Sequence, residues 1–466
     1  MVGSLADALH QNESIIALAL PLYRCVPRSG LEPASPTISA ELTGLPRFEG
    51  HQLIGRLLKT RTSGGILVYF LDCPILFDRP GIYGEEGRDY PDNAERFIGF
   101  CRLLLEGLKT SLKNFEDRWD ILHAHEWQTG IVPLLLKSRY ANDPFFQGTK
   151  TVFTVHNMAY QGLFPAEDFS LTGLPPDDFR HVEFFGKTNL LKAGLNAADI
   201  LTTVSPAYAR EAMTSQDGCG LEGILKERSA SFFGILNGID THVWNPEADP
   251  HLAARFSAAD VSGKSTCKSA LQREMGLPER TDVPLFAMMS RLAAQKGVDF
   301  AIEAVGRLTG RQAQWIFVGA GDPTLESAMK ALAASSPEKI AVKIVFDENL
   351  AHRIEAGADF FLMPSRFEPC GFNQMYSQSY GTVPIVRATG GLKDTVVDAD
   401  EDPQNGTGLV FGDASAEALQ AALERAFRLW EDPERLADVR RWGMTKDFSW
   451  KKSARQYLQL YERLLG

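Results

Sequence analysis

Short runs of apolar and β-branched residues, each followed by turn-forming residues, recur along this chain of 466 residues. Runs of this length are typical of buried strands, and many segments between them place apolar residues at helical spacing. The segment 419–430 is one of these, and Asp413 and Ser415 precede it as candidate helix caps. Strands that alternate with helices predict parallel sheets covered by helices on both faces. The runs are 15–20, 66–71, 151–155, 200–204, 285–289, 315–318, 343–346, 360–363 and 384–386.

The chain is too long for a single hydrophobic core, so we expect more than one domain. Between residues 237 and 255 a strand-like run gives way to Asn-Gly, Asn-Pro and Asp-Pro pairs, which are turn signals. The alternation of strands and helices starts afresh at Leu285. We therefore predict two doubly wound α/β domains, with an active cleft between them.

Composition excludes several classes of partner. A net charge of -11 gives no sign of the basic surface that binds nucleic acid. The six cysteines are scattered, without Cys-x-x-Cys pairs or zinc spacing, which favours reduced thiols in a cytoplasmic protein. No stretch approaches the roughly 18 to 20 apolar residues of a membrane span. We expect a soluble cytoplasmic protein with neither nucleic acid nor membrane as partner.

Two cations, Arg291 and Lys296, follow the run 285–289, and ligands bind at the carboxyl ends of strands in doubly wound sheets. Transfer of a sugar from a diphosphate leaves negative charge on the departing phosphate, which a metal or fixed cations must neutralise. Arginine grips two phosphate oxygens and lysine acts as a point charge. Alone, the two cations fit a solvated surface pair better, but the glycines that follow them favour phosphate binding.

Two glycine pairs are candidates for contact with a phosphate. Thr389-Gly390-Gly391 precedes a helix-like segment, whose first backbone amides can bind phosphate, although a tight turn explains it equally well. Gly319-Ala320-Gly321 is a poor dinucleotide fingerprint, because Asp322 and Pro323 follow where a third glycine is expected. We predict no NAD site.

Polar side chains after other runs fit a sugar better than a metal. Glu368 would repel a diphosphate, so its natural partner is a ligand hydroxyl, with capping or ion pairing as the alternative. His156 could also bind a sugar hydroxyl or be structural. His123 and His125 lack a third metal ligand nearby, and the Asp-x-Asp string 398–400 fits a solvated acidic loop. We predict no metal and no cofactor.

In sequence order, and over nearly the whole chain, several strings resemble the family of bacterial glycogen synthases and plant starch synthases. These are Leu-Phe-Asp-Arg-Pro-Gly-Ile-Tyr-Gly (76–84), His-Ala-His-Glu-Trp-Gln-Thr-Gly (123–130), Phe-Thr-Val-His-Asn-Met-Ala-Tyr-Gln-Gly (153–162), Gly-Cys-Gly-Leu-Glu-Gly (218–223), Ile-Leu-Asn-Gly-Ile-Asp (235–240), Ser-Arg-Leu-Ala-Ala-Gln-Lys-Gly (290–297), Arg-Phe-Glu-Pro-Cys-Gly-Phe-Asn-Gln-Met-Tyr (366–376) and Asp-Phe-Ser-Trp (447–450).

The resemblance implies a GT-B fold of two Rossmann-like domains. The first, on the acceptor side, would span residues 1–240, and the second, which binds the nucleotide sugar, would span 241–446. A C-terminal helix within 447–466 would pack back on the first. The implied reaction transfers glucose from ADP-glucose to the non-reducing end of an α-1,4-glucan, with retention of the anomeric configuration.

The resemblance also implies roles for individual residues. Arg291 and Lys296 would hold the diphosphate, and Glu368 would bind the donor glucose. The sugar pocket would be lined by His156, Asn237 and Glu126. The further donor-binding residues would be Gly3, Ser4, Gly319, Phe346 near the adenine, Cys370, Gly371, Phe372, Thr389, Gly390 and Gly391.

The chain departs from the family pattern at its start. The family begins with a strand and a Lys-x-Gly-Gly-Leu loop, whereas Met1 stands here in the lysine position and Gly3-Ser4 replace the glycines. The absent strand would be central, so its loss would expose two ladders of backbone groups. Glu126 stands where the family has aspartate, and Tyr376 where related transferases have a second glutamate.

We hypothesise a metal-independent, front-face transfer. Arg291 and Lys296 would draw charge onto the leaving ADP, while Glu368, His156 and Glu126 hold an oxocarbenium-like state. Two alternatives remain open at this stage. One is a related GT-B transferase that uses UDP-glucose, and the other is a catalytically impaired glucan-binding homologue.

Overall fold

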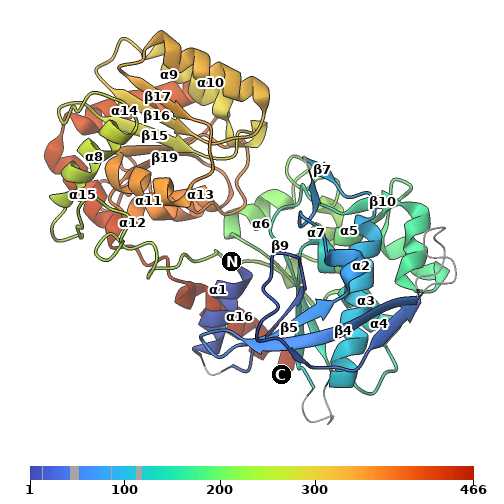
Figure 1. Ribbon diagram of the computed structural model, residues 1–466. Coiled ribbons are helices and arrows are strands. Elements are labelled where there is room, and N and C mark those ends of the chain that lie inside the picture. Colours follow the sequence, from blue (N-terminus) through green and yellow to red (C-terminus); the bar gives the residue numbers. More distant parts are fainter. Residues whose placement is uncertain (13, 42–51, 86, 112–117) are drawn as a thin grey trace. The chain divides into compact units, whose positions relative to one another are not determined.

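The structure, a computed structural model, describes residues 1–12, 14–41, 52–85, 87–111 and 118–466. By its contacts the chain divides into two compact units (Figure 1). Unit 1 comprises Met1–Val204, Ala209–Ile235 and Ser453–Gly466, and unit 2 comprises Ser205–Tyr208 and Leu236–Lys452. Both are α/β structures, and each is described by itself. None of the described helices combines the length and apolar character that crossing a membrane requires.

Unit 2 is built on one parallel sheet with the strand order β17-β16-β15-β18-β19-β20. The chain enters at the middle, runs outward on one side and then outward on the other. The order therefore reverses between β15 and β18, which is where a doubly wound sheet binds its ligand. The strands are β15 (Leu285–Met289), β16 (Gln314–Val318), β17 (Ile340–Lys343), β18 (Phe360–Met363), β19 (Val383–Arg387) and β20 (Leu409–Phe411).

Helices cover both faces of this sheet (Figure 1). On one face Phe286 stacks between Trp315 and Phe360, with ring centroids 4.3 and 5.0 Å apart. Successive strand residues point to opposite faces, so Leu285 and Phe361 belong to the core under the other helices. The first face carries α9 (Val298–Arg307), α10 (Pro323–Ser335), α14 (Ala416–Trp430) and α15 (Pro433–Met444), and the second carries α8 (Gly263–Glu274), α11 (Glu348–Gly357) and α13 (Gly390–Thr395).

The strands of unit 1 form two principal sheets. One is parallel, with the order β14-β13-β9-β8, and in the other β1 and β5 are parallel while β2, β3 and β5 pair antiparallel with β4. Among the described strands β1 pairs only with β5, and β8 only with β9. The bounds are β1 (Ala17–Pro21), β2 (Glu32–Pro33), β3 (Ile38–Glu41), β4 (Gln52–Arg61), β5 (Leu67–Asp72), β8 (Ile121–His125), β9 (Lys150–Val155), β13 (Ile200–Thr203) and β14 (Phe232–Gly234).

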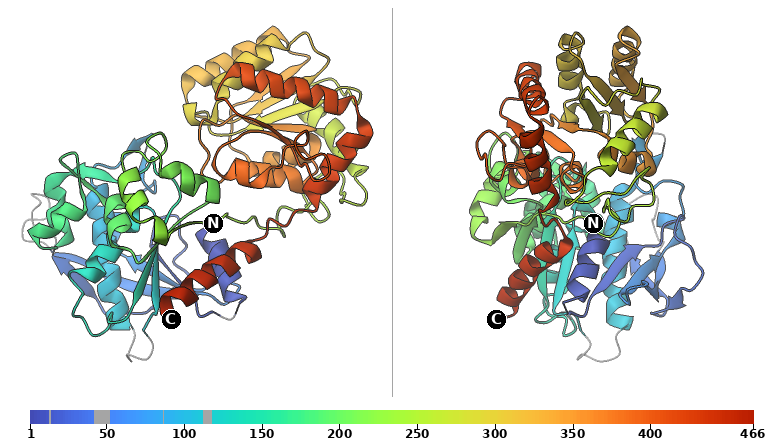
Figure 2. Two further views of the ribbon diagram at one scale, coloured as in Figure 1. Left: turned by 180° about the vertical axis from the view of Figure 1, so that it is seen from behind. Right: turned by 90° about the vertical axis from the view of Figure 1, so that its left-hand side faces the viewer.

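Short antiparallel pairs and helices complete unit 1. Helix α3 packs on β3 and β4, and α4 and α5 pack on β9. The last helix, α16 (Trp450–Leu465), drawn in red in Figure 2, belongs to unit 1 from Ser453 onward. The remaining helices and strands include α1 (Val2–His10), α2 (Pro74–Phe77), α3 (Asn93–Ser111), α4 (Val132–Lys137), α5 (Leu190–Ala197), α6 (Pro206–Ala212), α7 (Glu222–Glu227), β6 (Gly84–Glu85), β7 (Arg88–Asp89), β10 (Leu163–Pro165), β11 (Glu183–Phe184) and β12 (Lys187–Asn189).

Eight of the nine predicted strand runs coincide with strands to within a few residues. The run 343–346 was wrong, because β17 ends at Lys343 and the Asp347 side chain accepts the Leu350 N–H to start α11. The N-cap prediction at Ser415 is confirmed, since its Oγ accepts the Ala418 N–H. The expectation of parallel sheets fails for β4, whose alternating burial belongs to an antiparallel strand.

The acidic string 398–400 also differs from the expectation of a solvated loop. Asp398 is buried, and its Oδ1 binds Arg425 at 2.5 Å, while its Oδ2 accepts the Val410 N–H. Asp400 is exposed and binds the same guanidinium. The first carboxylate is therefore a structural anchor, paired because a buried charge without a partner is costly.

The buried carboxylate of Asp359 predicts a stability effect in unit 2. It binds Lys268 Nζ at 2.7 Å and Arg440 Nη2 at 2.6 Å, and it accepts the Leu285 N–H. Asp359→Ala leaves two cations without their anion, so we expect the free energy of unfolding to fall by about 3–5 kcal/mol in urea titrations.

Asp438→Ala is the matched control, because its pair with Arg441 is exposed on both sides. Such pairs contribute about 0.2–1 kcal/mol. Equal losses of unfolding free energy in the two variants would contradict the conclusion that the buried Asp359 stabilises unit 2.

Candidate functional site

The loops that follow β15 and β18 meet through an ion pair. Lys296 Nζ lies 2.5 Å from Glu368 Oε2, and Ser365 Oγ donates to the same oxygen at 3.1 Å. Glu368 is only 5% exposed, whereas the Lys296 side chain is 20% exposed. The sheet order makes β15 and β18 neighbours, so their carboxyl ends bring these two predicted residues together.

Glycines allow these loops to approach closely. Gly390 has φ +45°, and a Cβ there would lie 2.0 Å from the Glu368 carbonyl oxygen. The Gly391 N–H donates to that same carbonyl at 3.1 Å. Gly297 has φ +65°, and its Cβ would lie 2.0 Å from the Pro364 carbonyl oxygen. The predicted segment 389–391 therefore packs directly against the backbone of Glu368.

Arg291 extends from the same edge of the sheet. It is exposed, and among the described residues none binds its guanidinium. The loop around it is held to the loop that follows β16, since Leu292 N–H donates to Ala320 O and Asp322 N–H to Leu292 O. A Cβ at Gly319 would lie 1.9 Å from the Ser290 carbonyl oxygen, so Gly319 serves the close packing of these two loops.

Three further predicted residues lie beside Glu368. Cys370 is buried, and burial raises the pKa of its thiol to about 12 while a hydrogen bond with Asn237 opposes the shift. Gly371 has φ +74°, and a Cβ there would lie 2.5 Å from Gln374 Oε1. Phe372 stacks over Tyr376 with a centroid distance of 6.2 Å. Asn237 thus hydrogen-bonds with the segment after β18.

Other predicted donor residues have few neighbours in their own unit. Phe346 is 67% exposed, in the segment between β17 and α11. Gly3 and Ser4 lie in the first turn of α1 and not in the loop that the family pattern implied. Gly3 has open space around its Cα, so no contact there requires glycine.

In unit 1 two histidines of β8, His123 and His125, form a cluster with His156, which follows β9. His125 Nδ1 lies 3.1 Å from His156 Nε2, and the rings stack with centroids 5.4 Å apart. His123 stacks on His125 at 4.2 Å, as their spacing on one face of a strand predicts. Burial lowers the pKa of His123 to about 3 and of His156 to about 4, and it lowers that of His125 well below its usual value. All three rings are therefore neutral at neutral pH.

Glu126 has an unusual backbone and two backbone partners. Its φ is +64°, which is strained for a residue with a side chain. Its Oε1 accepts the N–H groups of His156 and Asn157 at 2.5 and 3.1 Å. Burial raises the pKa of this carboxyl to about 7, although the backbone donors favour its charged form. Glu126 thereby fixes the backbone that carries His156.

Two residues that hydrogen-bond to predicted site residues were not predicted from the sequence. Ser365 lies in the loop that follows β18, and only its hydrogen bond to Glu368 distinguishes it. Tyr461, on α16, binds His123 Nδ1 at 2.7 Å, and no local pattern announces a contact across such a separation.

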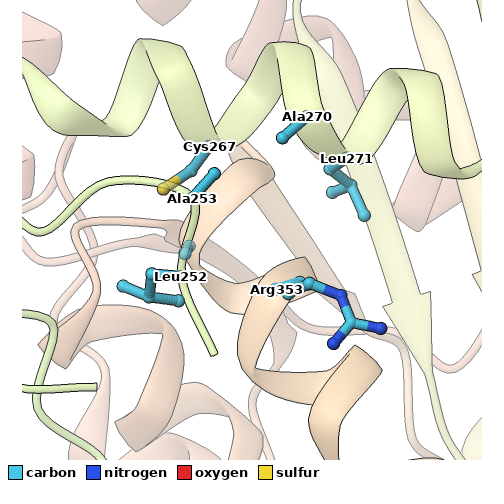
Figure 3. A pocket seen from close by; sticks show the side chains of 7 residues that line it. Leu252, Ala253, Cys267, Ala270, Leu271 and Arg353 are labelled. Atoms are coloured by element: carbon cyan, nitrogen blue, oxygen red, sulfur yellow. The ribbon is translucent and has the colours of Figure 1, made fainter. Parts of the chain in front are cut away.

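Neither a metal-binding cluster nor a hollow marks a second site among the described residues. They contain no cluster of three or more His, Cys, Asp or Glu side chains able to hold a metal ion. A small hollow lies between α8, α11 and the segment before α8, lined by Leu252, Ala253, Cys267, Ala270, Leu271, Arg353 and Ala356 (Figure 3). None of the predicted site residues lines it.

Comparison with known proteins gives matches over both units. Residues 1–227 match the family described as starch synthase catalytic domain, and residues 274–441 match glycosyl transferases group 1. A glycogen synthase of Anaeromyxobacter sp. is 52% identical over 85% of this chain and 83% of its own length. Glycogen synthase 2 of Geobacter sulfurreducens is 42% identical over 99% of this chain and 94% of its own.

Solved structures give the same result. The catalytic domain of starch synthase IV from Arabidopsis thaliana, bound to ADP and acarbose, has a TM-score of 0.86 and 33% identity, covering 100% of this chain and 95% of that one. Sucrose-phosphate synthase from Thermosynechococcus elongatus has a TM-score of 0.60 at 17% identity, over 99% of this chain and 92% of that one, which supports the fold alone. The expected GT-B fold is confirmed.

The close approach at Gly390 predicts a second stability effect. Gly390→Ala forces a Cβ against the Glu368 carbonyl and strains a positive φ, so we expect a loss of about 2–4 kcal/mol. Gly306→Ala is the control, because Gly306 lies on α9 with only ordinary contact around its Cα, and we expect a gain of about 0.5–1 kcal/mol. Thermal unfolding measures both, and similar midpoints would refute the tight packing of these loops.

The raised pKa of Glu126 predicts how stability varies with pH. The folded protein holds this proton more tightly than the unfolded chain, so the stabilisation is complete below pH 4.5 and is lost as pH rises through 7. Glu126→Gln keeps an acceptor oxygen but does not titrate. Between pH 4.5 and 8 the natural chain should lose about 1–3 kcal/mol relative to this variant in urea unfolding. Parallel stability profiles would contradict the raised pKa.

Proposed function

The chain belongs to the glycogen and starch synthase family and transfers glucose from ADP-glucose to an α-glucan; we propose that the loops at the carboxyl edge of the unit 2 sheet hold the donor for this reaction. The observation that carries the proposal is the Lys296–Glu368 pair beside Arg291. It joins cations for a diphosphate to a carboxylate for a sugar. The finer assignments below rest on these contacts and on the family pattern.

The cations neutralise the leaving group in this proposal. Departure of ADP places negative charge on its terminal phosphate, and fixed positive charges lower the barrier most when they need no rearrangement. Glu368 holds the Lys296 ammonium in place, while the exposed Arg291 guanidinium is available to grip two phosphate oxygens. Tight loop contacts at Gly297 and Gly319 give both cations a fixed base.

Carboxylate and imidazole groups recognise the sugar. Glu368 accepts hydrogen bonds from glucose hydroxyls, and His156 donates or accepts one. The buried His156 Nδ1 has no hydrogen-bond partner among the described residues. Glu126 acts on the same sugar through the backbone that it fixes at His156, and Asn237 contributes from the wall beside Cys370. A neutral imidazole suits this task, because it offers one donor and one acceptor.

We assign the remaining donor contacts to backbone groups. Cys370, Gly371 and Phe372 present amides beside Glu368, and the segment 389–391 packs against the same loop. Phe346 is exposed and suits a contact with the adenine ring. Gly3 and Ser4 complete the donor set from unit 1 in this proposal. In this proposal unit 2 supplies the contacts to the diphosphate and the adenine, and unit 1 serves the acceptor in addition to its contacts with the donor.

The bond changes proceed on one face of the sugar. The bond between C1 and the diphosphate oxygen breaks, and the hydroxyl oxygen at the non-reducing end of the glucan forms its bond to C1 on the same side. The hydroxyl proton passes to the departing phosphate oxygen, so charge and atoms balance and the configuration is retained. No metal takes part in this scheme.

We also place this reaction in the cytoplasm. All six cysteines are free thiols, four of them buried. Reducing compartments maintain that state.

Removing the cations tests the proposal. Arg291→Ala and Lys296→Ala should each lower incorporation of labelled glucose from ADP-glucose into glycogen by about 100- to 1,000-fold, with EDTA present. Lys330→Ala, an exposed lysine on α10, is the control and should retain the natural rate. Rates within a few-fold of the natural chain in both site variants would refute the assignment. UDP-glucose in place of ADP-glucose should give little incorporation.

A further inference from the structure

His123 is a partly buried histidine to which the proposed chemistry assigns no task, yet both of its ring nitrogens are bound. Nδ1 lies 2.7 Å from the hydroxyl of Tyr461, and Nε2 lies 2.6 Å from Thr154 Oγ1. Thr154 Oγ1 in turn lies 2.5 Å from Thr202 Oγ1 on the next strand. Since burial keeps the ring neutral, one nitrogen donates and the other accepts. A ring bound at both nitrogens has a fixed orientation.

The partner hydroxyl comes from α16, which packs an aromatic face on this ring. Tyr457 and Tyr461 lie one helical turn apart, and both contact His123, with ring centroids at 5.6 and 5.9 Å. Tyr457 is 1% exposed, and burial raises the pKa of Tyr461 above its usual value. Tyr461 is therefore a neutral hydroxyl group on a partly buried side chain of unit 1.

The fixed ring of His123 supports the two histidines beyond it. It stacks on His125 at an angle of 24°, and His125 stacks on His156 at 25°. The single polar link between the last two rings is His125 Nδ1 to His156 Nε2 at 3.1 Å. The tautomer of His125 decides which of the two nitrogens carries the proton, and hence whether His156 Nδ1 is a donor or an acceptor toward a ligand.

We propose that Tyr461 and His123 are positioning residues for His156, which they orient through the stacked ring of His125. The last helix of the chain thereby contributes to the transfer step from a distance. This inference rests on the proposed role of His156 at the sugar. A displaced imidazole costs rate because hydrogen bonds to a reacting sugar depend on position within fractions of an ångström.

Tyr461→Phe tests the inference because it removes one hydroxyl and keeps the ring packing. We expect kcat for glucose transfer from ADP-glucose to fall roughly ten-fold with KM little changed. Gln459→Ala, exposed on the same helix, should keep the natural kcat. His123→Gln is a second variant that retains polar atoms, and it should lower kcat like Tyr461→Phe. A natural rate in Tyr461→Phe would overturn the proposal.

A double-mutant cycle separates positioning from general structural support. In a His156→Ala background, Tyr461→Phe should cause no further loss, because the ring that it positions is gone. A loss of the same ten-fold size in that background would overturn the proposal, since the tyrosine would then act elsewhere.

A natural rate in His156→Ala would instead refute the proposed role of His156. The ring nitrogens, read by 15N NMR of histidine-labelled protein, would then decide this inference. Altered His125 and His156 nitrogen signals in Tyr461→Phe would sustain the coupling, and unchanged signals would overturn it.

Discussion

Parallel pairing of β15 with β18, and of β18 with β19, is the constraint on which the structure of unit 2 depends. The register pairs Phe286 with Phe360 and Phe360 with Val383, so the three strands end at one edge. The loops that follow these strands must therefore lie next to one another. The ion pair of Lys296 with Glu368 and the contact of Gly391 with Glu368 are consequences of that register. A slip by one residue would turn every side chain to the other face and disperse them.

The two units treat polar side chains in opposite ways. In unit 2 charge is kept and paired, at Lys296 with Glu368 and more deeply at Asp359 with Lys268. In unit 1 the histidines are stacked and buried so that they stay neutral. Burial is the main cause of the neutral state, because desolvation penalises the protonated ring, and neighbouring histidines lower the pKa values of His123 and His125 further.

Much of the unit 2 sheet could be predicted, because short apolar runs are typical of buried strands. The order of the strands then brings Lys296, Glu368 and the segment 389–391 together at their carboxyl ends. Other features depend on geometry that no local pattern encodes. The positive φ of Glu126 and its hold on the His156 backbone are consequences of two loops meeting, as is the burial of Asp398 under Arg425. Phe346 was predicted to lie in a strand, because an apolar run does not show that the strand ends at Lys343 and that Asp347 caps the next helix.

Glu126 also shows how a departure from a family pattern is absorbed. The side chain is longer than the aspartate of the family, yet its Oε1 reaches two backbone donors after β9. Strain in its backbone is the cost, and the two hydrogen bonds offset it.

The division of unit 1 into separate stretches of sequence has a consequence for biosynthesis. Unit 2 is almost contiguous, so its sheet can close while the chain is still attached to the ribosome. Unit 1 cannot be finished in the same order, because Ser453–Gly466 leaves the exit tunnel only after all of unit 2. Until then the aromatic face of α16 is missing, and the His123 ring lacks its tyrosine partner. The histidine arrangement of unit 1 is therefore completed only after the residues of α16 have been synthesised and have folded back.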